Sequence, residues 1–372
     1  MARVISRTRA MCSPGKYIQG RGELGNLPGF LSGFGDRALV LIDPLLYENF
    51  QNRLDQIFEG HDLNLVFVKF QGEASKNEIQ RVGEVGAKEN CDIVVGVGGG
   101  KTIDTAKTVA DRIQSPVIIV PTAASTDAPC SSLAVIYTDE GVYSEVIRFR
   151  RNPDIVLVDS DIVSKAPVRL LVAGMGDALA TFFEARANQD SDAANYVGAG
   201  YRRTLSGMAV ARLCYDILLE DGVKAKLAVQ RGACTEAVEN IIEANTLLSG
   251  LGFENCGCAA AHGIHDGLTA LAETHGIYHG EKVAFGTICQ LVLENRPMKE
   301  IQEVLGFCRS VGLPMVLADL GLGDAGQEKL MAVAEKSMHS TIHAEPFEVT
   351  INMVYDAMVT ADSLGKAYND AL

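Results

Sequence analysis

One stretch decides the fold: Cys91-Asp-Ile-Val-Val-Gly-Val-Gly-Gly-Gly-Lys-Thr-Ile-Asp-Thr-Ala-Lys107. An apolar run, Ile93–Val97, leads through three glycines directly into a helical pattern, Thr102–Ile113. Glycines at such a turn let the backbone approach a ligand closely, and the helix start offers unpaired N–H groups and a positive dipole end. The stretch therefore predicts a strand–turn–helix unit that binds an anion, most often a phosphate, with Lys101 as an added charge. An ordinary glycine-rich turn is the alternative, because the spacing matches neither common phosphate-binding fingerprint.

The first 165 residues repeat this alternation of apolar runs and helical patterns. Runs this apolar suit a parallel sheet that is covered on both faces, and the alternation indicates β-α-β units. The expected strands are Ala38–Asp43, Leu63–Phe70, Asp92–Val97 and Pro116–Val120, with Leu133–Tyr137, Ile155–Val158 and a hairpin arm at Val142–Ile147 as further candidates. The expected helices between them are Tyr47–Glu59, Lys76–Glu89 and Lys101–Arg112.

After Pro167 the pattern becomes helical throughout. The expected helices are Met175–Ala187, Tyr196–Glu220, Ala225–Leu248, Ala259–Glu273, Glu281–Leu293, Met298–Val311 and Asp324–Met338. We therefore predict an α/β domain over residues 1–165 and an all-α domain over residues 166–372. Ligands favour the cleft between domains and the carboxyl ends of parallel strands.

Composition narrows the class of protein. A chain of 372 residues is long enough for two domains, and its formal net charge of −14 argues against a nucleic-acid partner. No apolar run reaches the ~20 residues that span a bilayer, so no membrane partner is expected. Nine scattered cysteines, without paired Cys-x-x-Cys sets, indicate a reducing cytoplasm rather than a disulfide framework.

The helical half carries a histidine cluster. His262, His265, His275 and His279 are four of the seven histidines in the chain. Asp177 adds a carboxylate near the start of a largely apolar helix. Imidazoles and carboxylates are the usual ligands of zinc or iron, although hydrogen-bonded histidines and an acid in a first helical turn remain the alternative.

Two acidic side chains follow strands of the predicted sheet. Asp127 lies in the Ser/Thr/Asp-rich loop Pro121–Ser131, which leaves the carboxyl end of a strand and faces the same cleft as the glycines. Asp43 ends an early strand, where a carboxylate can accept hydrogen bonds from a ribose and disfavours a 2′-phosphate. Ordinary polar turns are the alternative at both places.

Taken in order, these segments resemble the iron-containing, or group III, alcohol dehydrogenase superfamily. The resemblance spans nearly the whole chain and is carried by Pro14–Gly20, Gly98–Lys107, Pro121–Pro129, Gly174–Thr181, Ala260–His265 and His279–Gly286. It implies the architecture shared with dehydroquinate synthase, with an N-terminal dinucleotide-binding domain and an all-α C-terminal domain for metal and substrate.

The resemblance also implies roles for individual residues. Asp177, His262 and His279 would hold a divalent metal and contact the substrate, and Asp127 would bind substrate hydroxyls. Iron-dependent relatives have another histidine four residues after the aspartate. Here Thr181 stands in that place, which favours zinc, with iron still possible. The NAD site would comprise Asp43 at the adenosine ribose, Gly99, Gly100 and Lys101 at the pyrophosphate, and Asp104, Thr122, Ser125, Ser131, Leu133 and Tyr137 elsewhere.

The remaining histidines would lie outside the metal ligands. By the same resemblance, His265 would lie beside these ligands or near the nicotinamide, and His275 would lie farther away.

The implied activity is NAD-dependent oxidation of glycerol and related vicinal diols to dihydroxyacetone by metal-assisted hydride transfer. Relatives are commonly octameric, so a homo-oligomer is expected. A dehydroquinate synthase-like lyase and a glycerol-phosphate dehydrogenase are rivals within the superfamily. The absence of Lys and Arg between Pro121 and Glu145 disfavours their anionic substrates. A nucleotide-binding module without catalysis is a further alternative.

Overall fold

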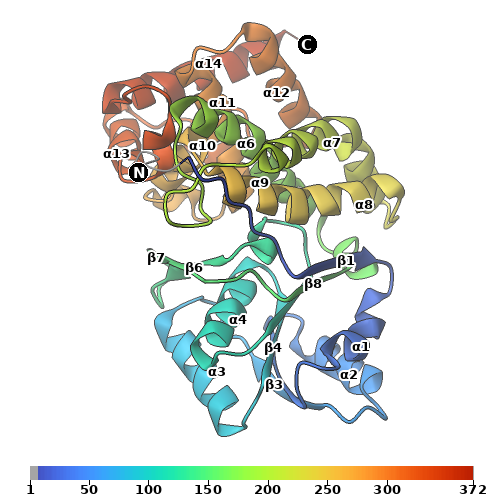
Figure 1. Ribbon diagram of the computed structural model, residues 1–372. Helices are drawn as coiled ribbons and strands as arrows, with labels where there is room; N and C mark the ends of the chain where they lie inside the picture. The colour runs from blue at the N-terminus through green and yellow to red at the C-terminus, as the bar shows by residue number, and fades with distance from the viewer. Residues whose placement is uncertain (1–6, 372) are drawn as a thin grey trace.

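A computed structural model describes residues 7–371 and shows two stacked parts, a sheet with helices on both faces and a larger all-helical part (Figure 1). The sheet has six strands in the order β1-β8-β5-β4-β2-β3, and every neighbouring pair is parallel. Its strands are β1 (Lys16–Gly20), β2 (Arg37–Ile42), β3 (Asn64–Lys69), β4 (Ile93–Gly98), β5 (Val117–Pro121) and β8 (Ile155–Asp159). The predicted parallel α/β sheet followed by a helical region is confirmed.

Helices cover both faces of the sheet because its central strands are apolar on both sides. Alternate residues of β2 pack in opposite directions: Val40 faces α1 (Leu27–Leu31) and α2 (Tyr47–Ile57), whereas Leu39 faces α3 (Lys76–Lys88) and α4 (Gly100–Ile113). Figure 1 shows these two helix pairs on either side of the sheet. A short antiparallel pair, β6 (Leu133–Tyr137) and β7 (Tyr143–Arg148), forms a separate hairpin beside α4.

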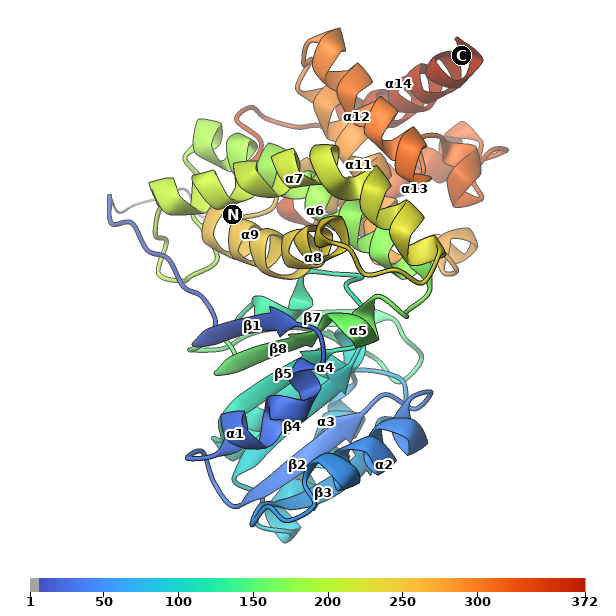
Figure 2. The ribbon, with the colours of Figure 1, turned by 90° about the vertical axis from the view of Figure 1, so that its right-hand side faces the viewer.

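The helical part is built around α6, which is buried on most sides from Leu171 to Asn188. Figure 2 shows its helices stacked above the edge of the sheet that holds β1 and β8. Its main helices are α6 (Val168–Ser191), α7 (Leu205–Gln230), α8 (Glu236–Glu243), α9 (Ser249–Cys256), α10 (Ala260–Leu268), α11 (His279–Leu293), α12 (Met298–Val311), α13 (Gln327–Ser337) and α14 (Ile351–Asp370). A π-turn, η3 (Ala244–Leu248), joins α8 to α9.

Three predicted helix ranges in this part are wrong. Residues 196–204 form a loop, since Gly198 and Gly200 adopt positive φ and the Thr204 side chain caps α7 by accepting from the Gly207 N–H. The break expected after Glu220 comes instead at Gly232, whose φ is 71°.

The helix expected over Ala259–Glu273 ends at Leu268, and a separate 3-10 turn follows at Ala272–Thr274. Helices α1, α5, α9 and α14 were not predicted.

The two parts are joined by a short segment and by the start of the chain. The predicted boundary at residue 165 lies between α5 (Ser160–Val163) and α6. Before it enters β1, the chain lies against the helical part, where the Ala10 N–H donates to the Arg202 carbonyl and Cys12 contacts Asn255. Among residues 7–371, no helix is both long and apolar enough to cross a bilayer.

Candidate active site

The carboxyl ends of β2 and β4 form the topological switch point of the sheet. The chain leaves β2 toward β3 on one side and leaves β4 toward β5 on the other, so a crevice opens between these two strand ends. Asp43 lies there at the end of β2, with its backbone N–H donating to the Val97 carbonyl at 3.0 Å. Its Oδ1 accepts from the Leu45 N–H at 2.9 Å, so the carboxylate also closes the turn after β2.

The glycine turn from β4 into α4 has the predicted strand–turn–helix form. Gly99 caps α4, and no side chain caps the helix start. A Cβ built on Gly99 meets no atom within 4 Å, so there is open space beside this turn. The helix therefore presents free first-turn N–H groups to an open space, as an anion site requires.

Lys101 follows this turn and is held by two partners. Its Nζ lies 2.6 Å from Glu73 Oε1 and 5.2 Å from the centre of the Tyr137 ring. This arrangement brings the β6 hairpin beside the glycine turn, with Lys101 still half-exposed.

Two predicted dinucleotide-site residues, Asp104 on α4 and Ser131 just before β6, are buried where α4 meets the hairpin. Asp104 is 6% exposed, lies 3.0 Å from Lys107 Nζ and accepts from the Val135 N–H at 2.9 Å. Burial raises the pKa of Asp104, which the charge of Lys107 partly offsets. Ser131 is fully buried, and Lys107 donates to the Ala128 carbonyl beside it at 2.9 Å. These groups fix the loop after β5 and the hairpin, so their predicted contact with a dinucleotide remains a prediction.

The other predicted residues lie in the segment that follows β5 and in the hairpin. Thr122 follows β5 and donates its backbone N–H to Gly98 at 3.1 Å. Ser125 lies in the loop beyond it, and Leu133 begins β6. An open pocket of about 740 Å³ is lined in part by Pro44, which follows Asp43 in the chain, and by Phe70 and Arg81.

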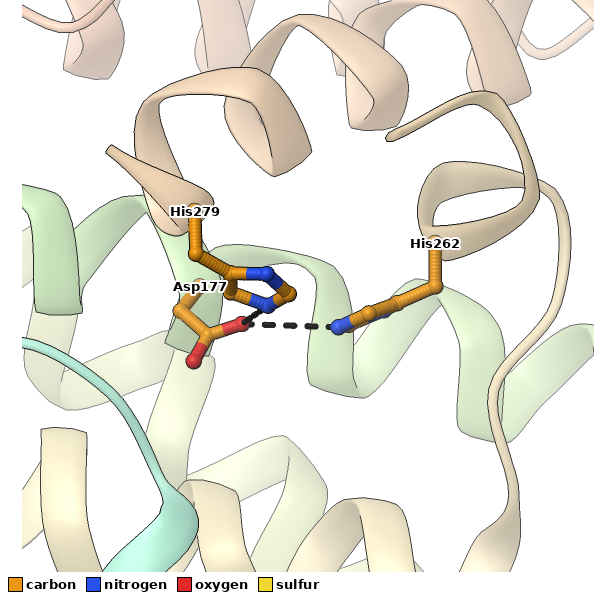
Figure 3. Close-up of side chains that lie close together, drawn as sticks. All are labelled: Asp177, His262 and His279. Carbon is orange, nitrogen blue, oxygen red and sulfur yellow. Dashed lines mark hydrogen bonds and ion pairs between the residues drawn. The ribbon is translucent and has the colours of Figure 1, made fainter. Parts of the chain in front are cut away.

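Asp177, His262 and His279 converge from three helices although they are far apart in the sequence (Figure 3). Asp177 Oδ1 lies 3.1 Å from His279 Nε2 and 3.4 Å from His262 Nε2, and all three donor atoms lie within 4.8 Å of one another. The carboxylate is 1% exposed. One buried carboxylate and two imidazoles form a donor set that fits zinc or another divalent transition metal.

A close crossing of α6 and α11 brings this set together. A Cβ on Gly280 would lie 1.8 Å from the Ala173 carbonyl oxygen, and one on Gly176 would lie 2.3 Å from the Gly280 carbonyl oxygen. Only glycine permits this approach. Since Gly176 precedes Asp177 and Gly280 follows His279, the crossing sets the separation of the two donor side chains.

Glu184 is a site residue that the sequence reasoning missed. Its Oε2 lies 2.7 Å from His262 Nδ1, so the other ring nitrogen, Nε2, faces Asp177. Its Oε1 accepts from the N–H groups of Ala259 and His262 at 2.8 and 2.9 Å, at the start of α10. Glu184 lies two helical turns after Asp177 on α6, so an acid seven residues further along an apolar helix was the available signal.

The pKa values of the two carboxyl groups in this site are shifted in opposite directions. Burial alone raises the pKa of Asp177, but the imidazoles of His279 and His262 outweigh burial and hold the pKa of this carboxyl well below its usual range. Burial, and then the charge of Asp177, raise the pKa of Asp127. Asp127 adjoins the donor set, because its backbone N–H donates to Asp177 Oδ2 at 3.3 Å.

The two other clustered histidines differ. His265 lies in α10 with its ring centre 4.2 Å from that of His279, and burial lowers the pKa of His265 to about 3. His275 is exposed on the turn before α11. The structure thus brings His265 beside the donor set and leaves His275 outside it.

Comparison with known proteins agrees with this fold. The sequence pattern of the family described as iron-containing alcohol dehydrogenase matches residues 14–160. Glycerol dehydrogenase from Thermotoga maritima is 50% identical over 95% of this chain and 96% of its own length, and glycerol dehydrogenase from Citrobacter freundii is 47% identical over 96% and 98%. The crystal structure of a probable glycerol dehydrogenase from Sinorhizobium meliloti 1021 has a TM-score of 0.92 and 54% identity, with coverage of 97% and 99%.

A parallel sheet with an open glycine turn faces a helical part with clustered metal donors, and the near full-length similarity to dehydrogenases shows that the chain is an oxidoreductase. The chain belongs to the iron-containing alcohol dehydrogenase family.

Proposed function

We propose that this chain oxidises glycerol and related vicinal diols to the corresponding hydroxyketones, dihydroxyacetone from glycerol, with NAD as hydride acceptor. The observation that carries the proposal is the convergence of Asp177, His262 and His279 beside Asp127. The near full-length similarity to glycerol dehydrogenases supports the choice of substrate.

In this proposal Asp177, His262 and His279 hold a divalent metal. When bound, such an ion supplies Lewis acidity, which lowers the pKa of a substrate hydroxyl that it contacts. Zinc is the metal we propose, since Thr181 stands where iron-dependent relatives have a fourth protein ligand. Glu184 holds the His262 ring so that Nε2 is directed at Asp177.

The dinucleotide would lie across the switch point. Gly99, Gly100 and Lys101 would hold the pyrophosphate at the α4 N-terminus, Asp43 would accept hydrogen bonds from the adenosine ribose, and the pocket beside Pro44 is the space for the adenine. The nicotinamide accepts the hydride when it is bound. The rest of the proposed binding surface is Asp104, Thr122, Ser125, Ser131, Leu133 and Tyr137.

Asp127 is the proposed acceptor for a substrate hydroxyl. It adjoins Asp177, so a diol with one hydroxyl at the donor set has its second hydroxyl within reach of this carboxylate. An acidic acceptor favours a neutral polyol over a phosphorylated one. The segment from Pro121 to Glu145 contains no Lys or Arg, which further disfavours the lyase and glycerol-phosphate alternatives.

The proposal extends to the whole protein. Residues 1–165 would carry NAD, and residues 166–372 would carry the metal and most of the substrate contacts. We propose a cytoplasmic location, supported by the nine free cysteines, and a homo-oligomer, with eight chains by resemblance. Exposed Leu205, Leu213 and Leu227 on α7 support self-association.

A panel of diols tests the function. NADH formation from glycerol, 1,2-propanediol and longer polyols is measured before and after chelation, together with the metal content of the purified chain. We expect about one metal per chain, loss of turnover on chelation and recovery with zinc. His262→Ala should lose both metal and turnover. Full turnover in this variant after chelation contradicts the proposal, and a metal-free chain that binds NADH without turnover indicates a nucleotide-binding module.

A further inference from the structure

The π-turn Ala244–Leu248 lies where the helical part meets the loop after β5. A π-turn adds a residue to one turn of helix and so re-aims the side chains that follow it, and such turns are frequent at functional sites. In this chain the turn and the residue after it carry three buried polar side chains, from Asn245, Thr246 and Ser249.

Asn245 and Thr246 tie three elements together. Asn245 Nδ2 donates to the Ala124 carbonyl at 2.9 Å and to the Leu171 carbonyl at 3.0 Å, so it joins the loop to α6. Thr246 Oγ1 lies 2.8 Å from the hydroxyl of Tyr17 in β1. These contacts fix the loop that bears Asp127 relative to the helix that bears Asp177.

Ser249 continues this arrangement to Asp127 itself. Its Oγ donates to Asp127 Oδ2 at 2.7 Å, and Thr181 Oγ1 lies 2.9 Å from the same Ser249 oxygen. Since the proton of Ser249 goes to the carboxylate, Thr181 must donate to Ser249. The result is a directed chain from Thr181 through Ser249 to Asp127, with Ser249 0% and Thr181 2% exposed.

Close packing of α9 against α6 keeps this series of hydrogen bonds in place. A Cβ on Gly252 would lie 2.3 Å from Thr181 Cγ2, so α9 lies directly against α6 at this residue. Among residues 7–371, Ser249 is the side chain that bonds the Asp127 carboxylate, and it engages only Oδ2, so Oδ1 faces no other side-chain donor.

We propose that Ser249, oriented by Thr181, is a positioning residue that sets the Asp127 carboxylate for the second hydroxyl of a vicinal diol. The inference rests on the proposed function and adds two residues to it. Ser249 acts through Asp127 and does not itself touch the substrate. Because the hydrogen bond fixes one carboxylate oxygen, its loss should weaken diol binding and leave the dinucleotide site unchanged.

Ser249→Ala tests the proposal in the full-length, zinc-loaded chain. We expect the KM for glycerol to rise about tenfold, equivalent to about 1.4 kcal/mol, and kcat to change less than about threefold. The Kd for NADH, followed by its fluorescence, should stay within about twofold of wild type. Thr181→Val should raise the KM for glycerol about threefold. Ser249→Thr keeps a hydroxyl, so its KM for glycerol should be close to that of wild type.

Ser337→Ala is the matched control, because Ser337 is equally buried but bonds only to the Val333 carbonyl of its own helix. Its KM for glycerol should match wild type. A glycerol KM within twofold of wild type in both Ser249→Ala and Thr181→Val overturns the inference alone. The inference is also overturned if Ser249→Ala raises the glycerol KM and the NADH Kd in parallel and lowers the thermal midpoint. A wild-type chain that forms no NADH from any diol overturns the proposed function as well.

Discussion

Glu184 shows how a single buried side chain can prepare a metal site. Its two oxygens bond the His262 ring and two N–H groups at the start of α10, so the ring and the helix that carries it are fixed together. A carboxylate behind a ligating imidazole raises the basicity of the imidazole and holds its orientation. Glu184 should therefore control metal affinity although it lies behind His262.

Replacement of Glu184 by glutamine should lower zinc affinity about 10- to 100-fold, because the amide is a weaker partner for the imidazole N–H. Competition with a chromophoric chelator measures this affinity directly. Glu254→Gln is the control, since Glu254 is also buried but holds Ser132 and Asn152 on the other side of α9. Equal zinc affinities in the two variants would show that Glu184 has no influence on the metal.

Asp43 has two roles to separate, since its carboxylate closes the turn after β2 and also carries the negative charge proposed to face the ribose. Asp43→Asn keeps an oxygen for the Leu45 N–H but removes the negative charge, so the turn after β2 should persist. We expect the preference for NAD over NADP, expressed as a ratio of kcat/KM values, to fall about tenfold, or ~1.4 kcal/mol. A steady-state comparison of the two dinucleotides measures it. An unchanged ratio with an intact thermal midpoint would mean that Asp43 only closes the turn.

At the scale of elements, the sequence predicted the sheet better than the helical part. The strands are short, continuous apolar runs bounded by turns, so β6 was found at its observed bounds and most other strands within one residue. Helix α6 has a weakly sided pattern because most of its residues are buried, and α7 has one because it also exposes apolar residues such as Leu213 and Leu227. Apolar spacing alone therefore did not locate the loop before Leu205. The start of α7 depends on the Thr204 cap and nearby positive-φ glycines.

The candidate site divides in a similar way. The glycine turn, Asp127 and the three proposed metal donors were predicted from motifs in order along the chain. Glu184 and Ser249 were not, because their roles depend on which helices cross, and a local pattern does not contain that information. Asp104 and Ser131 were also predicted from a motif, and the structure adds that their neighbours bury both side chains.

The α4 N-terminus offers a clean test of the predicted dinucleotide site. Gly99→Ala should leave folding stability unchanged, because Gly99 has φ −89° and ψ −173° and its Cβ direction is empty. The methyl group would occupy the space next to the helix N–H groups, so the Kd for NADH should rise at least about tenfold. Gly25→Ala, at an equally open position away from the site, is the control. A Gly99→Ala chain with normal NADH affinity would place the pyrophosphate elsewhere.

At the scale of the whole molecule, the start of α10 matters both for the stability of the fold and for the position of His262. Its first N–H groups donate hydrogen bonds to buried side chains from three separate elements. These are Glu184 from α6, Gln290 from α11, and Glu345 from the segment before α14. The helix that carries His262 is therefore held in place by long-range contacts, and its position depends on the complete helical part.

Glu345 makes this arrangement sensitive to pH. Burial, and then the nearby charge of Glu294, raise the pKa of Glu345 to about 9. Because the folded-state pKa lies above the unfolded value, the carboxyl stabilises the fold fully below about pH 4.5, and this contribution is lost as pH rises toward 9. Glu345→Gln keeps an oxygen for the Ala260 N–H without the ionisation. The variant should gain stability over wild type with rising pH, by at least about 2 kcal/mol between pH 5 and 8. Urea unfolding at a series of pH values measures the difference, with the exposed Glu335→Gln as a control that should follow wild type. Parallel curves for Glu345→Gln and wild type would mean that Glu345 does not take up a proton on folding.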